Sequence, residues 1–184
     1  MDGEINIWLH NNPYKDKKRA KAHSDAILQQ LLQKALNTSN HITIYKGVNG
    51  KPFVNHPVFF SHSNSRQLHA YVIHQDFDIG LDVELKKTSR DFLKTARRYF
   101  HPKEYEDLLL VGEAARLETF YQQWTRKEAW CKLEGGNLWS YLNKLPSADA
   151  KIHFCETHVV KGFAVALASP QIINKIRINT IGKG

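Results

Sequence analysis

Hydrophobic and polar positions along the first half of the chain predict one long helix among short strands. Residues 5–9 alternate in polarity as a strand does, whereas the apolar positions of residues 15–36 recur at helical spacing. Three further strands are predicted at residues 41–46, 58–62 and 68–75, with a loop rich in Gly and Asn between the first two. The first half therefore predicts an α+β unit.

The second half repeats this order of elements. A strand is predicted at residues 78–85, Ser89 can cap a short helix, and a long helical pattern covers residues 113–134. We therefore predict two α+β lobes, residues 1–77 and 78–184, with a cleft between them. Three strands close the chain, near residues 151–154, 159–168 and 175–181.

The composition indicates a folded protein with an anionic partner. Apolar residues make up 42% of the chain, and its four Trp, seven Tyr and nine Phe are not typical of a disordered segment. The net charge of +8 favours a polyanion, which leaves nucleic acid, an acidic protein and a phosphate-rich small molecule as options. Two cysteines are too few for a disulfide framework or a Cys-based zinc site. Because no signal-peptide or membrane-span pattern is present, we expect a cytoplasmic protein.

Residues 77–85 carry the most informative pattern, because acidic residues occupy one face of a predicted strand. Side chains alternate across a strand, so Asp82 and Glu84 point the same way. Neighbouring like charges repel each other, and a hard cation such as Mg²⁺ would remove the conflict. The alternative is a solvated strand face with Lys86 and Lys87 as counter-ions, and the strand taken alone favours this alternative.

The predicted helix around residues 124–132 offers a third carboxylate. Glu128 lies one helical turn after Trp124, on or beside an apolar stripe, where a carboxylate needs a partner. Glu128 and Lys132 are also one turn apart, and an ordinary ion pair at this spacing contributes only about 0.2–0.5 kcal/mol. A third metal ligand with a neighbouring cation explains both the spacing and the apolar setting.

These motifs resemble those of a known family. Residues 80–84 (Gly-Leu-Asp-Val-Glu) and 124–132 (Trp-Thr-Arg-Lys-Glu-Ala-Trp-Cys-Lys) resemble the paired signatures of the 4′-phosphopantetheinyl transferase superfamily. Residues 50–52 (Gly-Lys-Pro) and 60–63 (Phe-Ser-His-Ser) are similar to the larger, single-chain type named after the surfactin synthetase activator. Residues 161–166 resemble the strand that closes the second lobe of that family.

The resemblance, which covers residues 47–168, implies a fold and an activity. The implied α+β fold is a pseudo-dimer of two similar lobes, each a small, mainly antiparallel sheet packed on a long helix, with the active site at the junction. The implied activity is Mg²⁺-dependent transfer of the phosphopantetheine group of coenzyme A to a serine of an apo carrier protein, releasing adenosine 3′,5′-bisphosphate. Carriers of fatty acid, polyketide or nonribosomal peptide synthesis are the implied partners, and we expect a monomer.

The resemblance also implies roles at the reacting end of the site. Asp82, Glu84 and Glu128 would hold Mg²⁺ beside the pyrophosphate of coenzyme A. Glu128 would also deprotonate the carrier serine, directly or through water. Lys132 would bind the pyrophosphate and steady the leaving group, and His62 completes the expected catalytic set.

At the other end of coenzyme A, Ser61 and His62 are expected to contact phosphate, with His62 at the 3′-phosphate. Gly50, Lys51 and Pro52 would border the adenine. Without the resemblance, a histidine between two serines after an apolar strand is typical of a partly buried side chain that is bonded to the backbone.

Other features leave two interpretations open. The basic residues at 15–21 form either a solvated helix face or a contact for coenzyme A or an acidic carrier. Residues 100–110 either dock the carrier or pack on their own lobe. Cys131 is expected to pack in an apolar stripe, and most histidines other than His62 are expected at the surface.

Two other classes of function compete with the transferase. A nucleic-acid-binding module would interleave stacking aromatics with Lys and Arg on one surface, whereas the aromatics here fall mostly on apolar faces. A non-catalytic homologue that only binds coenzyme A or a carrier would not need Asp82, Glu84, Glu128 and Lys132 together. We therefore expect neither nucleic acid nor a membrane as a partner.

Overall fold

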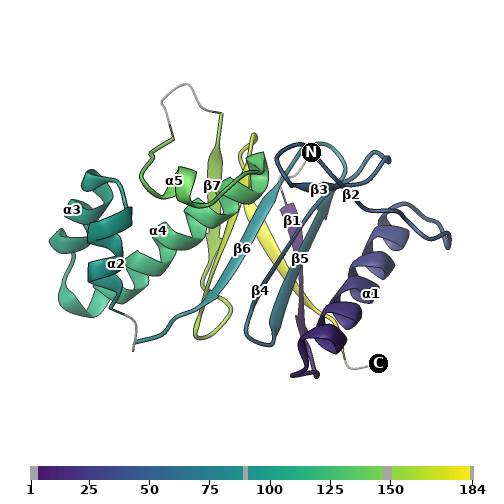
Figure 1. Cartoon of the computed structure of the whole chain (residues 1–184), viewed down its shortest axis with the longest axis horizontal. Helices are drawn as coiled ribbons and strands as arrows, with labels where there is room; N and C mark the ends of the chain where they lie inside the picture. Colours follow the sequence, from purple (N-terminus) through teal and green to yellow (C-terminus); the bar gives the residue numbers. More distant parts are fainter. Residues whose placement is uncertain (1–3, 89–90, 147–150, 183–184) are drawn as a thin grey trace.

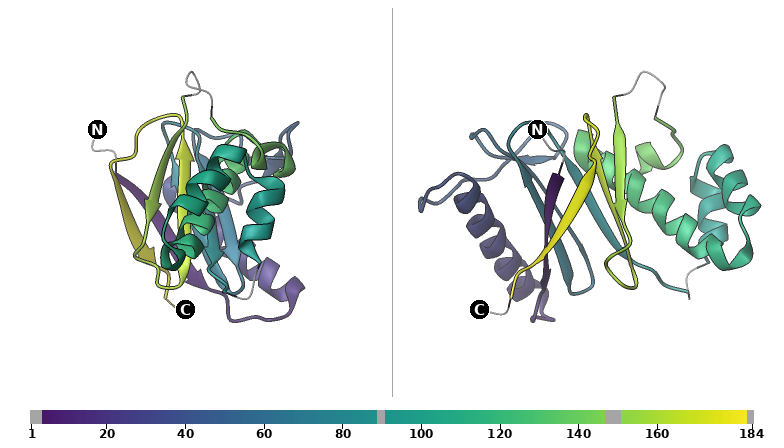
Figure 2. Two further views of the ribbon diagram at one scale, coloured as in Figure 1. Left: turned by 90° about the vertical axis from the view of Figure 1, so that its left-hand side faces the viewer. Right: turned by 180° about the vertical axis from the view of Figure 1, so that it is seen from behind.

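The computed structural model describes residues 4–88, 91–146 and 151–182 of the chain. Two sheets lie side by side in the middle of the molecule, and helices occupy both ends (Figures 1 and 2). One long helix covers the first sheet, and a longer helix with three short ones accompanies the second (Figure 1).

The first sheet has four strands in the order β4-β5-β1-β9. Strand β1 pairs antiparallel with β5 and parallel with β9, whereas β4 pairs antiparallel with β5 and forms one edge. A small hairpin, β2 with β3, precedes β4. The bounds are β1 Glu4–Asn11, β2 Tyr45–Lys46, β3 Pro52–Phe53, β4 Phe59–Ser65, β5 Leu68–His74 and β9 Lys175–Thr180.

Helix α1 (Lys17–Ala35) covers one face of this sheet. The Asp16 side chain accepts the backbone N–H of Arg19 and so satisfies one of the free donors at the helix start. The apolar side of α1 packs onto the sheet and the segment after the helix. This core consists of Ile27, Leu28, Leu32, Ile42, Val54, Val58, Phe60 and Tyr71.

The second sheet is antiparallel, with the order β6-β8-β7, and helix α4 packs along it. The small residues Ala129 on α4 and Ala166 and Ala168 on β8 allow this close packing. The bounds are β6 Gly80–Leu85, α2 Phe92–Tyr99, α3 Pro102–Leu110, α4 Glu113–Glu134, α5 Trp139–Leu142, β7 His153–Thr157 and β8 Phe163–Ser169.

Both sheets contribute to one apolar core. The predicted apolar face of residues 77–85 is confirmed, since Ile79, Leu81 and Val83 are fully buried there. Their partners come from β1, β5, β8 and the segment before β9. They are Ile5, Ile7, Leu9, Ala70, Val72, Val165, Leu167 and Ile173. The opposite face of β6 therefore carries Asp82 and Glu84 away from this core.

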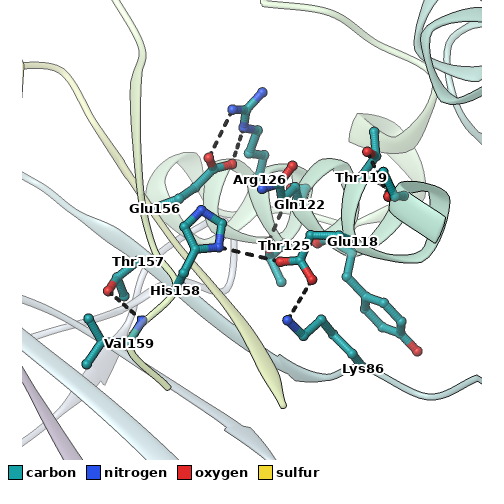
Figure 3. Close-up of polar contacts among 12 residues, drawn as sticks. Lys86, Glu118, Thr119, Gln122, Thr125, Arg126, Glu156, Thr157, His158 and Val159 are labelled. Carbon is teal, nitrogen blue, oxygen red and sulfur yellow. Dashed lines mark hydrogen bonds and ion pairs between the residues drawn. The ribbon is translucent and has the colours of Figure 1, made fainter. Parts of the chain in front are cut away.

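Ion pairs connect α4 to β7 and to the residues that directly follow β6 and β7 (Figure 3). Oε2 of Glu118 pairs with the Lys86 ammonium at 2.6 Å, and Oε1 of Glu118 lies 3.5 Å from Nδ1 of His158. Two turns further along the helix, the Arg126 guanidinium binds both carboxylate oxygens of Glu156. Partly exposed pairs of this kind contribute only about 0–1 kcal/mol each to stability.

The predicted α+β class is confirmed as a mixed fold of small sheets and several helices. The last strand, β9, pairs with β1 and therefore joins the sheet of the first half. The pseudo-dimeric character and the boundary between residues 1–77 and 78–184 stay predictions.

Two predicted strands are shorter in the structure, because side chains occupy their backbone groups. The strand predicted at residues 41–46 is wrong over residues 41–44, because the Gln29 side chain takes both backbone groups of Ile42. The Gln29 amide nitrogen donates to the Ile42 carbonyl at 2.6 Å, and its oxygen accepts the Ile42 N–H at 3.1 Å. The strand predicted from residue 78 begins at Gly80, since the Asp78 carboxylate accepts the N–H of Ile79.

The boundaries of β7 and β8 also differ from the prediction. The strand predicted at residues 159–168 begins only at Phe163, because residues 160–163 form a turn in which Gly162 has φ 82°. The preceding strand lies at residues 153–157 instead of 151–154. Ser89 lies outside the described residues, and Asp91 caps α2 by accepting the N–H of Lys94.

Candidate active site

Three carboxylates from distant parts of the chain meet beside β6. Asp82, Glu84 and Glu128 each offer one oxygen, and these oxygens lie within 4.8 Å of one another. Asp82 and Glu84 are two residues apart on the strand, so they share a face, while Glu128 reaches them from α4. This is the convergence that the sequence predicts.

The absence of a side chain at Gly80 allows α4 to approach β6. A Cβ atom at this position would lie 2.0 Å from the carbonyl oxygen of Ala129 and 2.6 Å from the backbone N of Leu133. Any larger residue would push the helix away from the strand. Gly80 therefore sets the separation at which Glu128 can join the strand carboxylates.

Asp82 is the most buried member of the cluster, with 1% of its surface exposed. Its Oδ1 accepts from Oγ of Ser63 and from Nζ of Lys132, both at 2.8 Å. Its Oδ2 is buried and has no hydrogen-bond partner within the described ranges. An unsatisfied buried carboxylate oxygen is costly, and here it is the atom that a cation would satisfy.

Burial makes the cluster unfavourable for three negative charges. Burial, and then the charge of Asp82, raises the pKa of Glu128 to about 7, although Lys132 opposes the shift. The same two causes raise the pKa of Glu84, against the hydrogen bond from Ser65. Two carboxyl groups with raised pKa values, Glu84 and Glu128, beside a buried Asp82 oxygen without a partner fit a hard divalent cation such as Mg²⁺.

The alternative interpretation of Glu128 and Lys132, an ordinary ion pair between them, is not found among the described side chains. The Lys132 ammonium turns instead to Oδ1 of Asp82 and to Oγ of Ser63, at 2.8 and 2.7 Å. This contact joins α4 to both β4 and β6. Lys132 also lines the neighbouring pocket, so it connects the carboxylates with that space.

An open pocket of about 810 Å³ adjoins the cluster. The residues expected to contact coenzyme A all line it. They are Gly50, Lys51, Pro52, Ser61, His62 and Lys132. Helix α1 and the segment after it form the opposite wall, through residues such as Leu28, Gln29 and Ile42.

Lys51 connects the loop at residues 47–52 to the second half. Its ammonium donates to the Asp78 carboxylate and to the carbonyl oxygen of Leu133 near the end of α4. Burial lowers the pKa of Lys51, although Asp78 opposes the shift. The Lys51 ammonium is therefore already bonded within the protein. Lys51 contributes to the pocket through the conformation of the loop at residues 47–52.

His62 is neutral, in contrast to what a simple phosphate contact would suggest. Burial, followed by the neighbouring His69, lowers its pKa to about 3. The ring stacks on Tyr71 with centroids 4.6 Å apart, and its Nε2 lies 3.0 Å from Nδ1 of His69. Any contact from His62 to a phosphate is therefore a hydrogen bond rather than an ion pair.

The hydrogen bonds around His69 determine which nitrogen of His62 carries the proton. Two hydrogen bonds orient the Asn12 side chain. Its oxygen accepts the backbone N–H of Tyr14, and its nitrogen donates to the carbonyl oxygen of Ala20. Its amide N–H therefore points to Nε2 of His69, at 3.4 Å, which places the His69 proton on Nδ1. His69 then donates to Nε2 of His62, and Nδ1–H of His62 remains as a donor.

Two expectations about other residues need correction. Of the histidines expected at the surface, His41, His56 and His158 are exposed, but His10 and His69 are buried, and His23 lies 2.9 Å from His10 between their Nε2 atoms. Cys131 is not in the core, because its half-buried thiol lines the pocket next to Lys132. Hydrophobic periodicity alone does not show which side of a helix faces a pocket.

The basic segment at residues 15–21 is exposed, as one of its two interpretations requires. Lys21 lines the pocket and is paired with Asp25, while Lys15 and Lys17 line an adjoining hollow of about 700 Å³ that also reaches His62. In residues 100–110, Phe100 and Leu108 are buried, whereas Leu110 is 83% exposed. That helix thus both packs on its own lobe and presents an apolar surface.

Sequence reasoning missed the partners of the strand carboxylates on β4. Oγ of Ser63 donates to Asp82, and Oγ of Ser65 donates to Glu84. The available signal was a serine at every second position of residues 61–65, which places all three on one face of a strand.

Comparison with known proteins identifies the family. A family model, described as the 4′-phosphopantetheinyl transferase superfamily (ACPS), matches residues 78–169, which is half of the 184-residue chain. The chain belongs to this superfamily. The match includes Asp82, Glu84, Glu128 and Lys132, whereas the loop at 50–52 lies outside it.

Individual transferases of the superfamily are similar to this chain. The 4′-phosphopantetheinyl transferase gsp of Aneurinibacillus migulanus is 26% identical over 156 residues, covering 78% of this chain and 65% of gsp. AcpT of Escherichia coli (strain K12) is 30% identical over 112 residues, covering 60% and 55%. Sfp of Bacillus subtilis is 40% identical over 60 residues, covering 33% and 26%. The chain thus spans less than two thirds of the length of these relatives.

One further feature concerns membranes. Across the part of the chain that the structure describes, no helix has both the length and the apolar character that crossing a bilayer requires.

Proposed function

We propose that this protein transfers the 4′-phosphopantetheine group from coenzyme A to a serine hydroxyl of an apo carrier protein, with Mg²⁺ as cofactor. The observation that carries the proposal is the meeting of Asp82, Glu84 and Glu128 beside Lys132, at the wall of a large pocket. Membership of the superfamily and the similarity to gsp, AcpT and Sfp support it.

In the proposed reaction, the carrier serine oxygen bonds to the β-phosphorus of coenzyme A. The bond from that phosphorus to the bridging oxygen breaks, and adenosine 3′,5′-bisphosphate leaves with the electron pair. The serine proton passes to Glu128, directly or through water.

Asp82, Glu84 and Glu128 would hold the Mg²⁺. When bound, the ion neutralises charge on the diphosphate oxygens as the transfer proceeds. Lys132 would donate to the departing phosphate, because its ammonium already lies at the boundary between the cluster and the pocket. Neutralising the leaving side in this way is the electrostatic contribution that phosphoryl transfer needs.

The rest of coenzyme A would occupy the pocket. Gly50, Lys51 and Pro52 would border the adenine, and Ser61 and His62 would contact phosphate through neutral donors, with His62 at the 3′-phosphate. A partner carrier would approach the same opening. The protein would work as a monomer, since residues of this one chain line the pocket and supply the three carboxylates.

The direct test is transfer to a panel of apo carrier proteins from fatty acid, polyketide and nonribosomal peptide synthesis. With Mg²⁺ and coenzyme A, intact-protein mass spectrometry should show the phosphopantetheine arm on at least one carrier. Asp82→Ala and Glu128→Ala should abolish transfer, while Glu113→Ala, an exposed carboxylate on the same helix as Glu128, should not. Transfer to no carrier, or full activity of Asp82→Ala, would contradict the proposal.

A further inference from the structure

The edges of the two sheets meet without a backbone ladder. Strand β4 is an edge of the first sheet and β6 is an edge of the second, and the two strands belong to different sheets. Edge strands leave backbone N–H groups without strand partners, and buried N–H groups need acceptors. The structure shows that side chains of β4 supply these acceptors.

Three serines at alternate positions of β4 bridge to β6. Ser61, Ser63 and Ser65 accept the backbone N–H groups of Leu81, Val83 and Leu85, at 3.0, 3.3 and 2.9 Å. The offset between partners is constant, so the serines follow the strand step by step. We call this set the serine ladder. It joins the two sheets through the hydroxyl groups of one strand.

The ladder directs the Ser63 proton to one atom. A serine hydroxyl can accept two hydrogen bonds and donate one. The Val83 N–H and the Lys132 ammonium occupy both acceptor positions of Ser63. Its only proton therefore goes to Oδ1 of Asp82, at 2.8 Å. With Oδ1 held in this way, the unpartnered Oδ2 is the oxygen left for a cation.

Ser65 makes the corresponding contacts with Glu84 and Leu85. Its hydroxyl accepts the Leu85 N–H and donates to Oε2 of Glu84 at 2.9 Å. Ser61 differs, because the residue at the matching position of β6 is Gly80, which has no carboxylate. Ser61 thus accepts the same kind of backbone hydrogen bond but does not orient a metal-binding carboxylate.

We propose that Ser63 and Ser65 are positioning residues that orient Asp82 and Glu84 for the metal ion, so that contact between β4 and β6 determines metal affinity. This inference rests on the proposed function only in assigning a metal ion to the three carboxylates. Hydroxyl groups that orient metal-binding carboxylates change affinity by about 10–100-fold when they are removed. Through the serine ladder, the packing of the two sheets would therefore affect how tightly the site binds the metal ion.

The test measures metal binding directly and uses Ser61 as a matched control. Mn²⁺ binding is followed by electron paramagnetic resonance, with and without coenzyme A, for the parent protein and for Ser61→Ala, Ser63→Ala and Ser65→Ala. All three variants lose one acceptor for a backbone N–H, so each should lose stability in thermal unfolding, and Ser63→Ala should lose most because Asp82 and Lys132 also lose a partner. Ser63→Ala and Ser65→Ala should bind Mn²⁺ about tenfold more weakly. In the samples without coenzyme A, whose phosphate Ser61 is proposed to contact, Ser61→Ala should bind it within about twofold of the parent. Ser65→Thr, which keeps the hydroxyl, should recover affinity.

The outcomes separate this inference from the proposed function. If the parent protein transfers phosphopantetheine and binds Mn²⁺, but all three alanine variants bind it equally well, the positioning role is overturned and the proposed function stands. If the parent protein binds no Mn²⁺ under either condition, the metal assignment and the positioning role fall together.

Discussion

Nζ of Lys132 donates to Oδ1 of Asp82 at 2.8 Å, and this contact joins the long helix of the second half to the strand that carries two of the three site carboxylates. The same ammonium donates to Ser63 at 2.7 Å. An ammonium has three N–H donors, so one is left to face the pocket that Lys132 lines. Lys132 is therefore oriented before any ligand arrives.

This orientation predicts a specific effect on the chemical step. Lys132→Ala should lower kcat for phosphopantetheine transfer by about 100-fold, because a preplaced donor to the leaving phosphate is lost. Lys161→Ala removes an exposed lysine from the turn before β8 and serves as the charge-matched control. Steady-state kinetics with a carrier protein measure both, and an unchanged kcat in Lys132→Ala would exclude the assigned role.

Much of the site could be predicted because its parts are local patterns. The alternation in residues 77–85 places Asp82 and Glu84 on one strand face, and helical spacing places Glu128 beside an apolar stripe. The ladder from Ser63 and Ser65 could not be predicted, because it depends on which strand of one sheet meets which strand of the other. The pairing of β9 with β1 is non-local for the same reason.

The raised pKa of Glu128 predicts how metal-free stability changes with pH. The folded-state pKa of about 7 lies above the ordinary value of 4.5, so the folded protein binds more protons between these values. Stability should therefore fall as the pH rises through this window. Mg²⁺ replaces the proton, so its stabilising effect on thermal unfolding should be larger at about pH 8 than at about pH 5.5.

Two variants make this prediction specific. Glu128→Gln should remove most of the fall in metal-free stability, since the group no longer ionises, while Glu113→Gln should retain it. An equal Mg²⁺ effect at both pH values in the parent protein would show that the cluster does not take up the ion in exchange for a proton.

The lowered pKa of His62 predicts the opposite slope at acid pH. The folded-state value of about 3 lies below the ordinary 6.5, so the unfolded chain binds more protons between them. Stability should be lost as the pH falls through this window, and His62→Gln should reduce the loss. Nitrogen NMR of the imidazoles should show His62 protonated on Nδ1 at neutral pH, with no titration between about pH 5 and 8. Protonation on Nε2 would contradict the chain of donors from Asn12 through His69.

Cys131 offers a test of pocket occupancy that needs no turnover. The chain has two cysteines; Cys131 lines the pocket, whereas Cys155 lies on β7 and is not among the lining residues described for it. Burial raises the pKa of both thiols, so alkylation with iodoacetamide is best followed at about pH 9. The ligand should be adenosine 3′,5′-bisphosphate, because coenzyme A carries a thiol that would itself react.

At a ligand concentration about ten times the dissociation constant, alkylation of Cys131 should slow by about tenfold, since only the unoccupied protein reacts. Cys155 should react at an unchanged rate in the same sample, and peptide mass spectrometry distinguishes the two sites. Equal protection of both cysteines would indicate a general stabilisation instead of occupancy. No protection of Cys131 would mean that the adenosine end of the substrate lies elsewhere, and the assignment of residues 50–52 to the adenine would then be wrong.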